Sequence, residues 1–232
     1  MRVGDVVAID GSEGHHGVSV RRVSVGERVE LVDGGGLRAS AKVTSVQKRS
    51  FTVAIDAVQV EQRPGPTVTV VQALLKGDRS ELAVELMTEL GVDRIVPWRA
   101  ERCIARWDDA KAAKAVEKWR ATAREAAKQS RQAHIPTVST PIETSELPAL
   151  IAAADAAYVL HEQAMPTDVQ VPAEGSVLVI VGPEGGITDA ELDDMNGATK
   201  LRLGPTVLRG STAGAASLAY LFSRTPRWKE MV

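Results

Sequence analysis

The sequence predicts an α/β protein in which a small β-rich region precedes a larger domain, and three observations carry that prediction. Apolar and polar side chains alternate with a period of two in several stretches of the first 67 residues. Two prolines and a glycine then interrupt the chain at Arg63-Pro64-Gly65-Pro66, which cannot continue a central strand. Beyond this break, strand-like and helix-like segments alternate, which is typical of an α/β domain. We therefore expect two domains, residues 1–67 and 68–232.

The first domain is expected to be all-β. Its alternating stretches predict strands at residues 28–32, 41–46 and 51–55, and the turn formers Asp33-Gly34-Gly35-Gly36 separate the first two. Short strands at close spacing favour a small barrel. His15 and His16 lie between glycines without carboxylates at metal-binding spacing, so we expect a loop there and no metal.

The second domain is expected to hold a mainly parallel sheet. The continuous apolar run at Ser176–Val181 predicts a strand covered by helices on both faces. The capping box Thr188-Asp189-Ala190-Glu191 predicts the start of a helix. The other elements expected in chain order are a strand at 68–73, a helix at 78–90 closed by Gly91, a strand at 94–97, a long polar helix at 108–132, a segment at 135–139, a short helix at 145–153, and strands at 157–160 and 200–203 before a last helix at 211–223.

Composition excludes several classes of protein. The chain has 232 residues, 44% hydrophobic and 25% charged, which is an ordinary globular balance. A single cysteine, Cys103, excludes an internal disulfide and a cysteine-based zinc site, and indicates a reducing cytosol. No run approaches the roughly 18 apolar residues of a membrane span, and the N-terminus lacks a signal-peptide pattern. We expect a cytoplasmic protein without membrane or metal partners.

The net charge of −2 is an average over unlike segments. Residues 1–70 carry +1, residues 71–135 carry +3 and residues 136–232 carry −6. The stretch from Arg99 to Arg131 holds ten basic and five acidic residues. Such a face can neutralise RNA phosphates, but on charge alone a solvated helix with pairs between neighbouring turns is the favoured interpretation.

The strongest candidate for a binding site is Val181-Gly182-Pro183-Glu184-Gly185-Gly186, which follows the buried strand. Ligands of α/β proteins bind at the carboxyl ends of parallel strands, and glycines let a ligand approach the backbone closely. The loop lacks the terminal Gly-Lys-Ser/Thr of a phosphate-binding loop and the spacing of a dinucleotide fingerprint.

Two further segments follow predicted strands. In the segment from Leu203 to Gly214, Ser211 and Thr212 are expected to cap the last helix, and Arg209 is placed to hold a phosphate or an oxyanion. The small residues that follow suit close helix contact, either in the core or across a dimer. His161-Glu162 is either an acid–base pair or, more commonly, a structural histidine beside a carboxylate. Cys103 lacks a catalytic signature around it.

Together these loops resemble the RsmE family, the small-subunit 16S ribosomal RNA (uracil-N3)-methyltransferases of the SPOUT superfamily. The resemblance rests on the sequences that begin at Gly182, Leu203 and Leu208, and it extends to Leu75-Lys76-Gly77-Asp78-Arg79, Thr88-Glu89-Leu90-Gly91-Val92 and Arg124-Glu125-Ala126-Ala127-Lys128-Gln129-Ser130-Arg131. The first domain is similar, more loosely, to the PUA-like barrel of that family.

The resemblance implies a SPOUT domain with a trefoil knot, a homodimer, and S-adenosylmethionine held in the knot. Its predicted cofactor-binding residues are Leu160, His161, Glu162, Val181, Gly182, Pro183, Glu184, Gly185, Gly186, Leu203, Gly204, Leu208, Arg209, Ser211 and Thr212. We expect RNA contacts from Arg21, Arg22, Lys76, Arg79, Arg124, Gln129, Ser130 and Arg131. The basic first part of the chain would then bind phosphates, and the acidic last part would hold the cationic methyl donor.

The implied reaction is methylation of uracil N3 in 16S RNA of the small ribosomal subunit, with Arg209 and, more weakly, Glu184 as catalytic candidates. The family usually has Arg-x-Glu-Thr-Ala where this chain has Arg209-Gly210-Ser211-Thr212-Ala213, so no role of that glutamate carries over. A cap supplied by Ser211 is the expected replacement. The alternatives are a SPOUT methyltransferase acting on transfer RNA and an RNA-binding module without catalysis.

Overall fold

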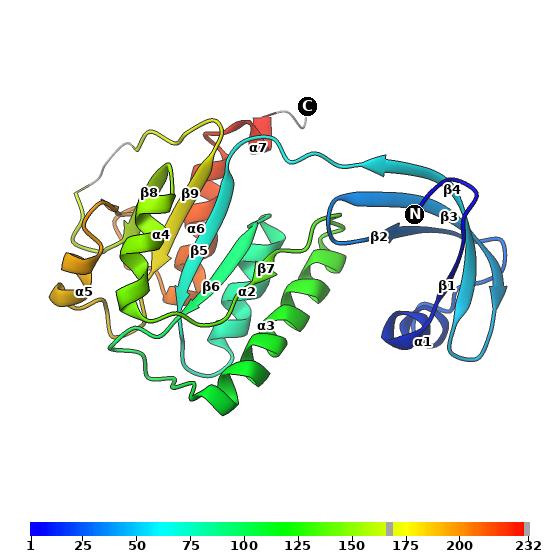
Figure 1. The fold of residues 1–232 in the computed structure, drawn as a ribbon, viewed down its shortest axis with the longest axis horizontal. Coiled ribbons are helices and arrows are strands. Elements are labelled where there is room, and N and C mark those ends of the chain that lie inside the picture. Colours follow the sequence, from blue (N-terminus) through cyan, green and yellow to red (C-terminus); the bar gives the residue numbers. More distant parts are fainter. Residues whose placement is uncertain (166–168, 230–232) are drawn as a thin grey trace. The chain divides into compact units, whose positions relative to one another are not determined.

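A computed structural model describes residues 1–165 and 169–229 of the chain (Figure 1). The chain divides into two compact units, Met1–Gln62 and Arg63–Val232. Each unit has its own hydrophobic core.

The first unit is a four-stranded antiparallel sheet with one helix. Its elements are β1 (Val6–Ile9), α1 (Gly11–Ser19), β2 (Arg28–Val32), β3 (Leu37–Val46) and β4 (Phe51–Val60). The strand order is β1-β4-β3-β2, so the three strands predicted from sequence pair as neighbours. Inward-facing Val43, Val53 and Ile55 are buried, as their period-two pattern predicts.

The expectation of an all-β first domain is wrong, because Gly11–Ser19 forms α1 and His15 and His16 lie on this helix rather than in a loop. Glycine is a poor helix former, which is why the sequence pattern favoured a loop. In the structure Gly14 and Gly17 are buried. A Cβ at Gly14 would lie 2.5 Å from the carbonyl oxygen of Ile9, and one at Gly17 would collide with the Phe51 ring. The glycines therefore serve the close packing of α1 on its neighbours.

The second unit is a six-stranded sheet with helices on both faces. Every strand pairing is parallel, and the order is β10-β8-β9-β5-β6-β7, which confirms the predicted parallel sheet. Its elements are β5 (Thr67–Ala73), α2 (Arg79–Glu89), β6 (Arg94–Trp98), α3 (Asp109–Gln129), β7 (Thr137–Val138), η1 (Thr144–Glu146), α4 (Leu147–Ala153), β8 (Ala156–Leu160), β9 (Ser176–Val181), α5 (Asp189–Asp194), β10 (Thr199–Leu201), α6 (Gly210–Phe222) and α7 (Pro226–Lys229).

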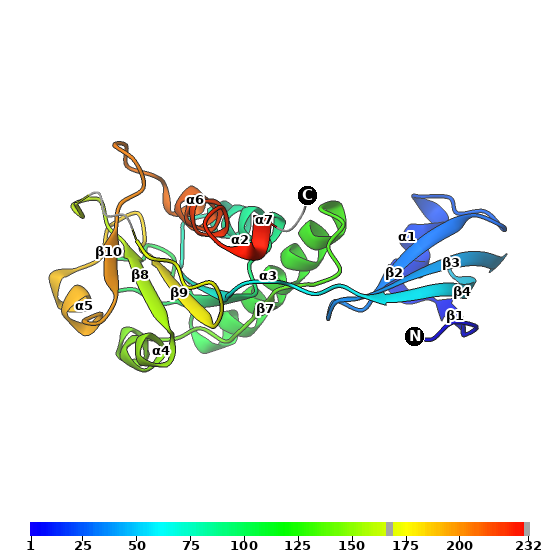
Figure 2. The same ribbon diagram turned by 90° about the horizontal axis from the view of Figure 1, so that it is seen from above.

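The helices cover the sheet as its apolar strands require. Five of the six residues of β9 are buried. Figure 2 shows α2 and α6 on one face of the sheet and α4 on the other. A Cβ at Gly214 of α6 would lie 2.7 Å from Met87 Sδ on α2, so the small residues of this helix allow close packing inside the unit.

The long basic helix α3 is amphipathic. Its buried side chains include Val116, Trp119 and Ala123, and Trp119 packs edge-on against Trp107. The Asp108 carboxylate accepts a hydrogen bond from Lys111 N at 2.9 Å and caps the N-terminus of the helix. In the described residues, no helix is both long enough and apolar enough to span a membrane.

Candidate active site

A cavity of about 630 Å³ lies at the carboxyl ends of three adjacent strands, β8, β9 and β10. Because these strands are parallel, the segments that follow them meet at one edge of the sheet. The lining comes from residues 160–163, 181–187, 200–203 and 206–210, together with Arg102, Asp189, Leu192 and Ala213. The three loops singled out in the sequence thus form one site.

Twelve of the fifteen predicted cofactor-binding residues line this cavity: Leu160, His161, Glu162, Val181, Gly182, Pro183, Glu184, Gly185, Gly186, Leu203, Leu208 and Arg209. Gly204, Ser211 and Thr212 are absent from the lining. His161 Nδ1 accepts a hydrogen bond from the backbone N–H of Gln163 at 3.3 Å, which fixes the imidazole ring within its own turn.

The expected cap of the last helix by Ser211 or Thr212 is wrong. Helix α6 begins one residue earlier, at Gly210, and the residue preceding it is Arg209, whose side chain makes no capping hydrogen bond. Ser211 lies inside the first turn and is 3% exposed. The Arg209 carbonyl accepts hydrogen bonds from Thr212 N and Ala213 N, while its exposed side chain borders the cavity.

The glycines after β9 are needed for close contacts. A Cβ at Gly182 would lie 2.7 Å from Ile187 Cγ1, and a Cβ at Gly185 would lie 2.9 Å from Arg102 Cβ and 3.0 Å from the Arg102 carbonyl oxygen. Gly186 has a φ of 76°, which disfavours any residue with a side chain. The loop is therefore clamped by its neighbours.

Arg102 is a cavity residue that sequence reasoning missed. It lies between β6 and α3, and its Nη1 donates a hydrogen bond to the Gly185 carbonyl at 3.3 Å. The preceding residue is fastened to α5, since Glu101 N donates to Glu191 Oε1 at 2.8 Å and Thr188 Oγ1 donates to Glu101 Oε2 at 3.3 Å. The sequence placed Arg102 in a basic stretch facing RNA or solvent, and no spacing signal connects it to a loop 83 residues away.

Glu184 connects the cavity to the segment after β5. Its Oε1 accepts a hydrogen bond from Lys76 N at 3.3 Å and lies 3.6 Å from Arg79 Nη1. Lys76 and Arg79, two of the expected RNA contacts, are therefore next to a residue that lines the cavity. The contacts also show that this carboxylate supports the loops around it.

The charge of the lining differs from the expectation of an acidic methyl-donor site. Four basic residues, Arg102, Lys200, Arg202 and Arg209, stand beside three carboxylates, Glu162, Glu184 and Asp189. The guanidinium of Arg202 donates to the carbonyls of Gly204 and Pro205 at 3.1 and 2.9 Å and so holds its own loop.

Cys103 is buried next to Arg102 in sequence, and burial raises the pKa of its thiol. The group is thereby kept in the protonated form, which is a poor nucleophile. In the described part of the chain, no group of three or more histidine, cysteine, aspartate or glutamate side chains is placed to hold a metal ion.

The other expected RNA contacts lie at helix ends or on α3. Arg21 Nη2 lies 3.5 Å from Glu27 Oε1. Arg22 is the next residue after Arg21 and is exposed in the segment after α1. Arg124, Gln129 and Arg131 are exposed at the C-terminal half of α3 and just beyond it. The Ser130 hydroxyl is directed inward and donates to the Ala126 carbonyl at 2.7 Å.

Comparison with known proteins agrees with this site. A model of the RNA methyltransferase domain matches residues 62–222, and a model of the RNA methyltransferase PUA domain matches residues 9–56. The chain is 44% identical over 233 residues to the Ribosomal RNA small subunit methyltransferase E of Mycobacterium tuberculosis, covering 97% of this chain and 89% of the relative. It is 31% identical to the Bacillus subtilis protein of the same name, with 94% and 90% covered.

Two solved structures share the whole fold. A Legionella pneumophila protein in complex with the bound cofactor SAM matches with a TM-score of 0.89 and 30% identity, covering 97% of this chain and 94% of that one. Ribosomal RNA small subunit methyltransferase E from Neisseria gonorrhoeae bound to S-adenosyl methionine matches with a TM-score of 0.86 and 29% identity, covering 96% and 93%. The chain therefore belongs to the RNA methyltransferase family whose curated members are named Ribosomal RNA small subunit methyltransferase E.

Proposed function

We propose that this protein transfers a methyl group from S-adenosylmethionine to N3 of a uridine in the 16S RNA of the small ribosomal subunit. The observation that carries the proposal is the cavity formed by the loops after β8, β9 and β10, which unites the segments predicted to bind the cofactor. Two neighbours of the same fold hold S-adenosylmethionine, and the relatives are named for small-subunit ribosomal RNA.

The cavity suits S-adenosylmethionine in size and chemistry. Its volume of about 630 Å³ lies within the roughly 300–1,000 Å³ of small-molecule sites. Apolar side chains suited to a purine ring line it beside carboxylates and guanidinium groups suited to the charged ends of an amino acid. The glycines at 182 and 185 line the cavity at positions where a side chain would collide with Ile187 or Arg102. When bound, S-adenosylmethionine supplies a methyl group on a cationic sulfur, which leaves as a neutral thioether with the bonding electron pair.

The protein's part in this reaction is to orient the uracil and to favour its ionised form. N3 must lose its proton before it attacks the methyl carbon, and the ring then carries negative charge. Arg209 borders the cavity at the start of α6, where its guanidinium and the N-terminus of the helix both favour an anion. We assign to Arg209 the stabilisation of that charge.

Glu184 is the weaker catalytic candidate. A carboxylate in the cavity can accept the N3 proton, but the contacts of Oε1 with Lys76 N and Arg79 favour a supporting role. We therefore propose that Glu184 chiefly fixes the loop after β9 against the segment after β5.

The proposal also covers the topology, the oligomeric state and the cellular location of the enzyme. We propose that the second unit is knotted and forms a homodimer, and that the protein acts in the cytoplasm on the small subunit. Mass measurement of the native protein tests the dimer; a monomeric enzyme with full activity would refute that part alone.

Replacing Arg209 tests the site directly. Arg209→Ala should lower kcat for methylation of small subunits by about 100-fold, the usual cost of one oxyanion-stabilising group. Cofactor affinity, measured by calorimetry, should change much less. The matched control is Arg94→Ala, because Arg94 is exposed at the start of β6, at the amino ends of the parallel strands, whereas the cavity lies at their carboxyl ends.

Full methyl transfer by Arg209→Ala would show that this side chain has no part in the reaction. If the wild-type protein binds the cofactor and methylates transfer RNA but not small-subunit RNA, transfer RNA is the substrate. A wild-type protein that binds no cofactor would leave only an RNA-binding module.

A further inference from the structure

Two arginines in this protein have a backbone conformation that usually requires glycine. Among the residues that the structure describes, Arg22 and Arg131 alone combine a side chain with a positive φ, 55° in each case. This left-handed conformation is unfavourable for a residue with a Cβ, so the surrounding structure must hold it. Both arginines are exposed, both follow the end of a helix, and both are among the expected RNA contacts. The strain thus coincides with two of the cations that we expect to contact RNA.

Helix α2 provides an internal comparison for Arg131. It ends with hydrogen bonds from Gly91 N to Thr88 O at 2.9 Å and from Val92 N to Met87 O at 3.1 Å. Helix α3 ends in the same way, with bonds from Arg131 N to Lys128 O at 3.1 Å and from Gln132 N to Ala127 O at 2.9 Å. This pair of bonds defines a helix end in which glycine is the usual left-handed residue. Helix α2 has that glycine, at a φ of 90°, and α3 has an arginine instead.

The side chain of Gln132 holds the turn at the end of α3. Its Nε2 donates to the carbonyls of Thr88 and Glu89 at 2.7 and 3.1 Å and to Ser130 Oγ at 2.9 Å. Ser130 Oγ in turn donates to Ala126 O at 2.7 Å. The residues on both sides of Arg131 are therefore fixed, one to its own helix and the other to the end of α2.

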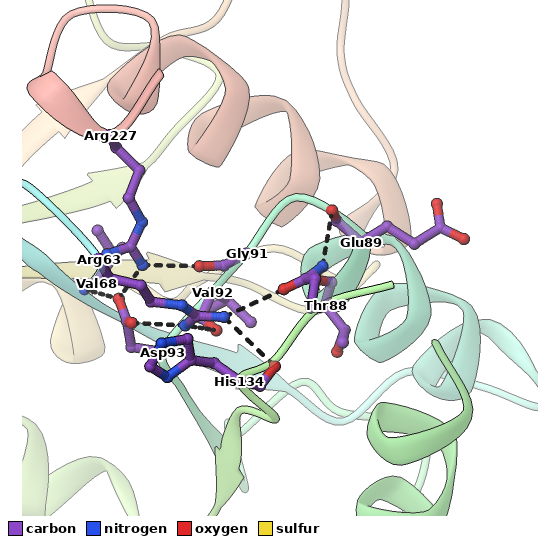
Figure 3. A network of polar contacts seen from close by, with 10 residues as sticks. Arg63, Val68, Thr88, Glu89, Gly91, Val92, Asp93, His134 and Arg227 are labelled. Carbon is purple, nitrogen blue, oxygen red and sulfur yellow. Dashed lines mark hydrogen bonds and ion pairs between the residues drawn. The ribbon is translucent and has the colours of Figure 1, made fainter. Parts of the chain in front are cut away.

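Gln132 is itself anchored by a partly buried ion network of Arg63, Asp93 and Arg227. Figure 3 shows how the side chains of these three residues lie. Arg63 Nη2 donates to Gln132 Oε1 at 3.1 Å, and Arg63 Nη1 pairs with Asp93 Oδ1 at 2.8 Å. Arg227 Nη2 pairs with Asp93 Oδ2 at 2.6 Å and donates to the Gly91 carbonyl at 2.9 Å. The side chains of Arg63, Asp93 and Arg227 are only 19%, 17% and 7% exposed, so water weakens these contacts little.

We propose that Gln132 is a positioning residue for RNA binding, which holds Arg131 in its left-handed conformation so that the guanidinium meets an RNA phosphate. Arg63 keeps the Gln132 amide in the orientation that this requires. The inference rests on the proposed function for the identity of the RNA, since small-subunit RNA is the partner that the relatives' names indicate.

Two substitutions separate the position of Arg131 from its charge. Arg131→Gly removes the cation but suits the left-handed turn, whereas Gln132→Ala keeps the cation and releases the turn. The measurements are the thermal unfolding midpoint, cofactor affinity by calorimetry, binding of small subunits purified from a strain lacking this protein, and the KM and kcat for methylation of those subunits. Gln170→Ala is the matched control, because Gln170 is an exposed glutamine of the same unit.

We expect Arg131→Gly to keep or raise the unfolding midpoint and yet to weaken subunit binding by about tenfold, the effect of losing one phosphate contact. Gln132→Ala should lower the midpoint and weaken subunit binding to a similar degree, and it should raise the KM for subunits while kcat and cofactor affinity stay at wild-type values. Arg131→Lys should recover most of the binding. In an Arg131→Gly background, Gln132→Ala should lower the unfolding midpoint less than it does in the wild type, because glycine adopts the left-handed conformation without support from Gln132.

Unchanged subunit binding in Arg131→Gly would overturn the inference, as would a Gln132→Ala protein that is less stable but binds subunits normally. If Gln132→Ala does not fold, Arg131→Gly and Arg131→Lys still decide whether the turn serves RNA. A wild-type protein that binds subunits without methylating them would refute the proposed reaction. The subunit affinities of the wild type and the Arg131 and Gln132 variants would still test whether Gln132 positions Arg131.

Discussion

At the scale of single residues, the site depends on glycines, because a Cβ at these positions would collide with neighbouring residues. Gly185 has no Cβ because Arg102 occupies that space, and the Arg102 guanidinium donates to the Gly185 carbonyl. Both residues line the cavity, although they come from segments far apart in sequence. A glycine-rich loop beside a buried strand could be found from the sequence, whereas the arginine against which it packs could not.

Gly185→Ala should weaken S-adenosylmethionine binding by about tenfold or more, because its Cβ would lie within 3.0 Å of the Arg102 backbone and must displace the loop or its neighbour. Calorimetric titration with the cofactor measures the change. Gly35→Ala is the matched control, because the nearest atoms to a Cβ at Gly35 are those of the Asp33 carboxylate, the first at an ordinary 3.5 Å. Wild-type affinity in Gly185→Ala would remove this loop from the cofactor site.

The same scale shows where residue types mislead. Serine and threonine are residue types that often cap helices, yet α6 starts before Ser211 and Thr212, and Ser211 is buried in its first turn. The strain at Arg131 leaves no trace in the sequence either, because nothing in an arginine signals a positive φ. Such features arise from tertiary contacts, here those of Gln132 with the end of α2.

At the scale of elements, hydrophobic periodicity predicted the second unit well and the first unit less well. The long apolar run of β9 and the capping box of α5 appear where expected, because buried parallel strands and helix starts have strong local signals. Helix α1 was missed since its glycines oppose helix formation locally and are explained only by the Phe51 ring and the Ile9 carbonyl against which they pack.

In helix α3, pairs within the protein explain some of the basic residues that the sequence left open between a solvated helix and an RNA-binding face. Lys118 Nζ lies 2.9 Å from Glu81 Oε1, and Arg120 is engaged by Glu117 and by the Val138 carbonyl. Arg124 is exposed and points from the same helix. Pairs within the protein thus account for part of the basic face, and an RNA contact by Arg124 stays a prediction.

Arg124→Ala and Lys118→Ala should therefore differ in their effect on RNA binding. If Arg124 contacts a phosphate, its loss should lower the slope of log affinity against log salt concentration by about one. Lys118→Ala should leave that slope unchanged and slightly lower the unfolding midpoint, since it breaks the pair with Glu81. Titrations of small subunits at several salt concentrations measure the slopes; equal slopes for the two variants would contradict the assignment of Arg124.

At the scale of the whole molecule, a net charge of −2 conceals a division between segments. The expected acidic methyl-donor site is not what the structure shows, because basic side chains outnumber carboxylates around the cavity. Arginines that line such a cavity are suited to an anionic substrate. We infer that substrate RNA as well as cofactor is met at this edge of the sheet.

The order of the two units could be predicted from the chain break near residue 63, and a ligand site could be predicted from three loops that follow parallel strands. The chemistry of the substrate could not, because no spacing in the sequence encodes which nucleotide is methylated or at which atom. The family resemblance carries that part of the account, and only a product can test it.

The central claim is tested most directly by mass spectrometry of 16S RNA nucleosides from a strain that lacks this protein. The account predicts that N3-methyluridine is lost at one position of the small-subunit RNA, and that it returns with the wild-type protein but not with Arg209→Ala. An unchanged level of N3-methyluridine, or the loss of a different methylated nucleoside, would contradict it.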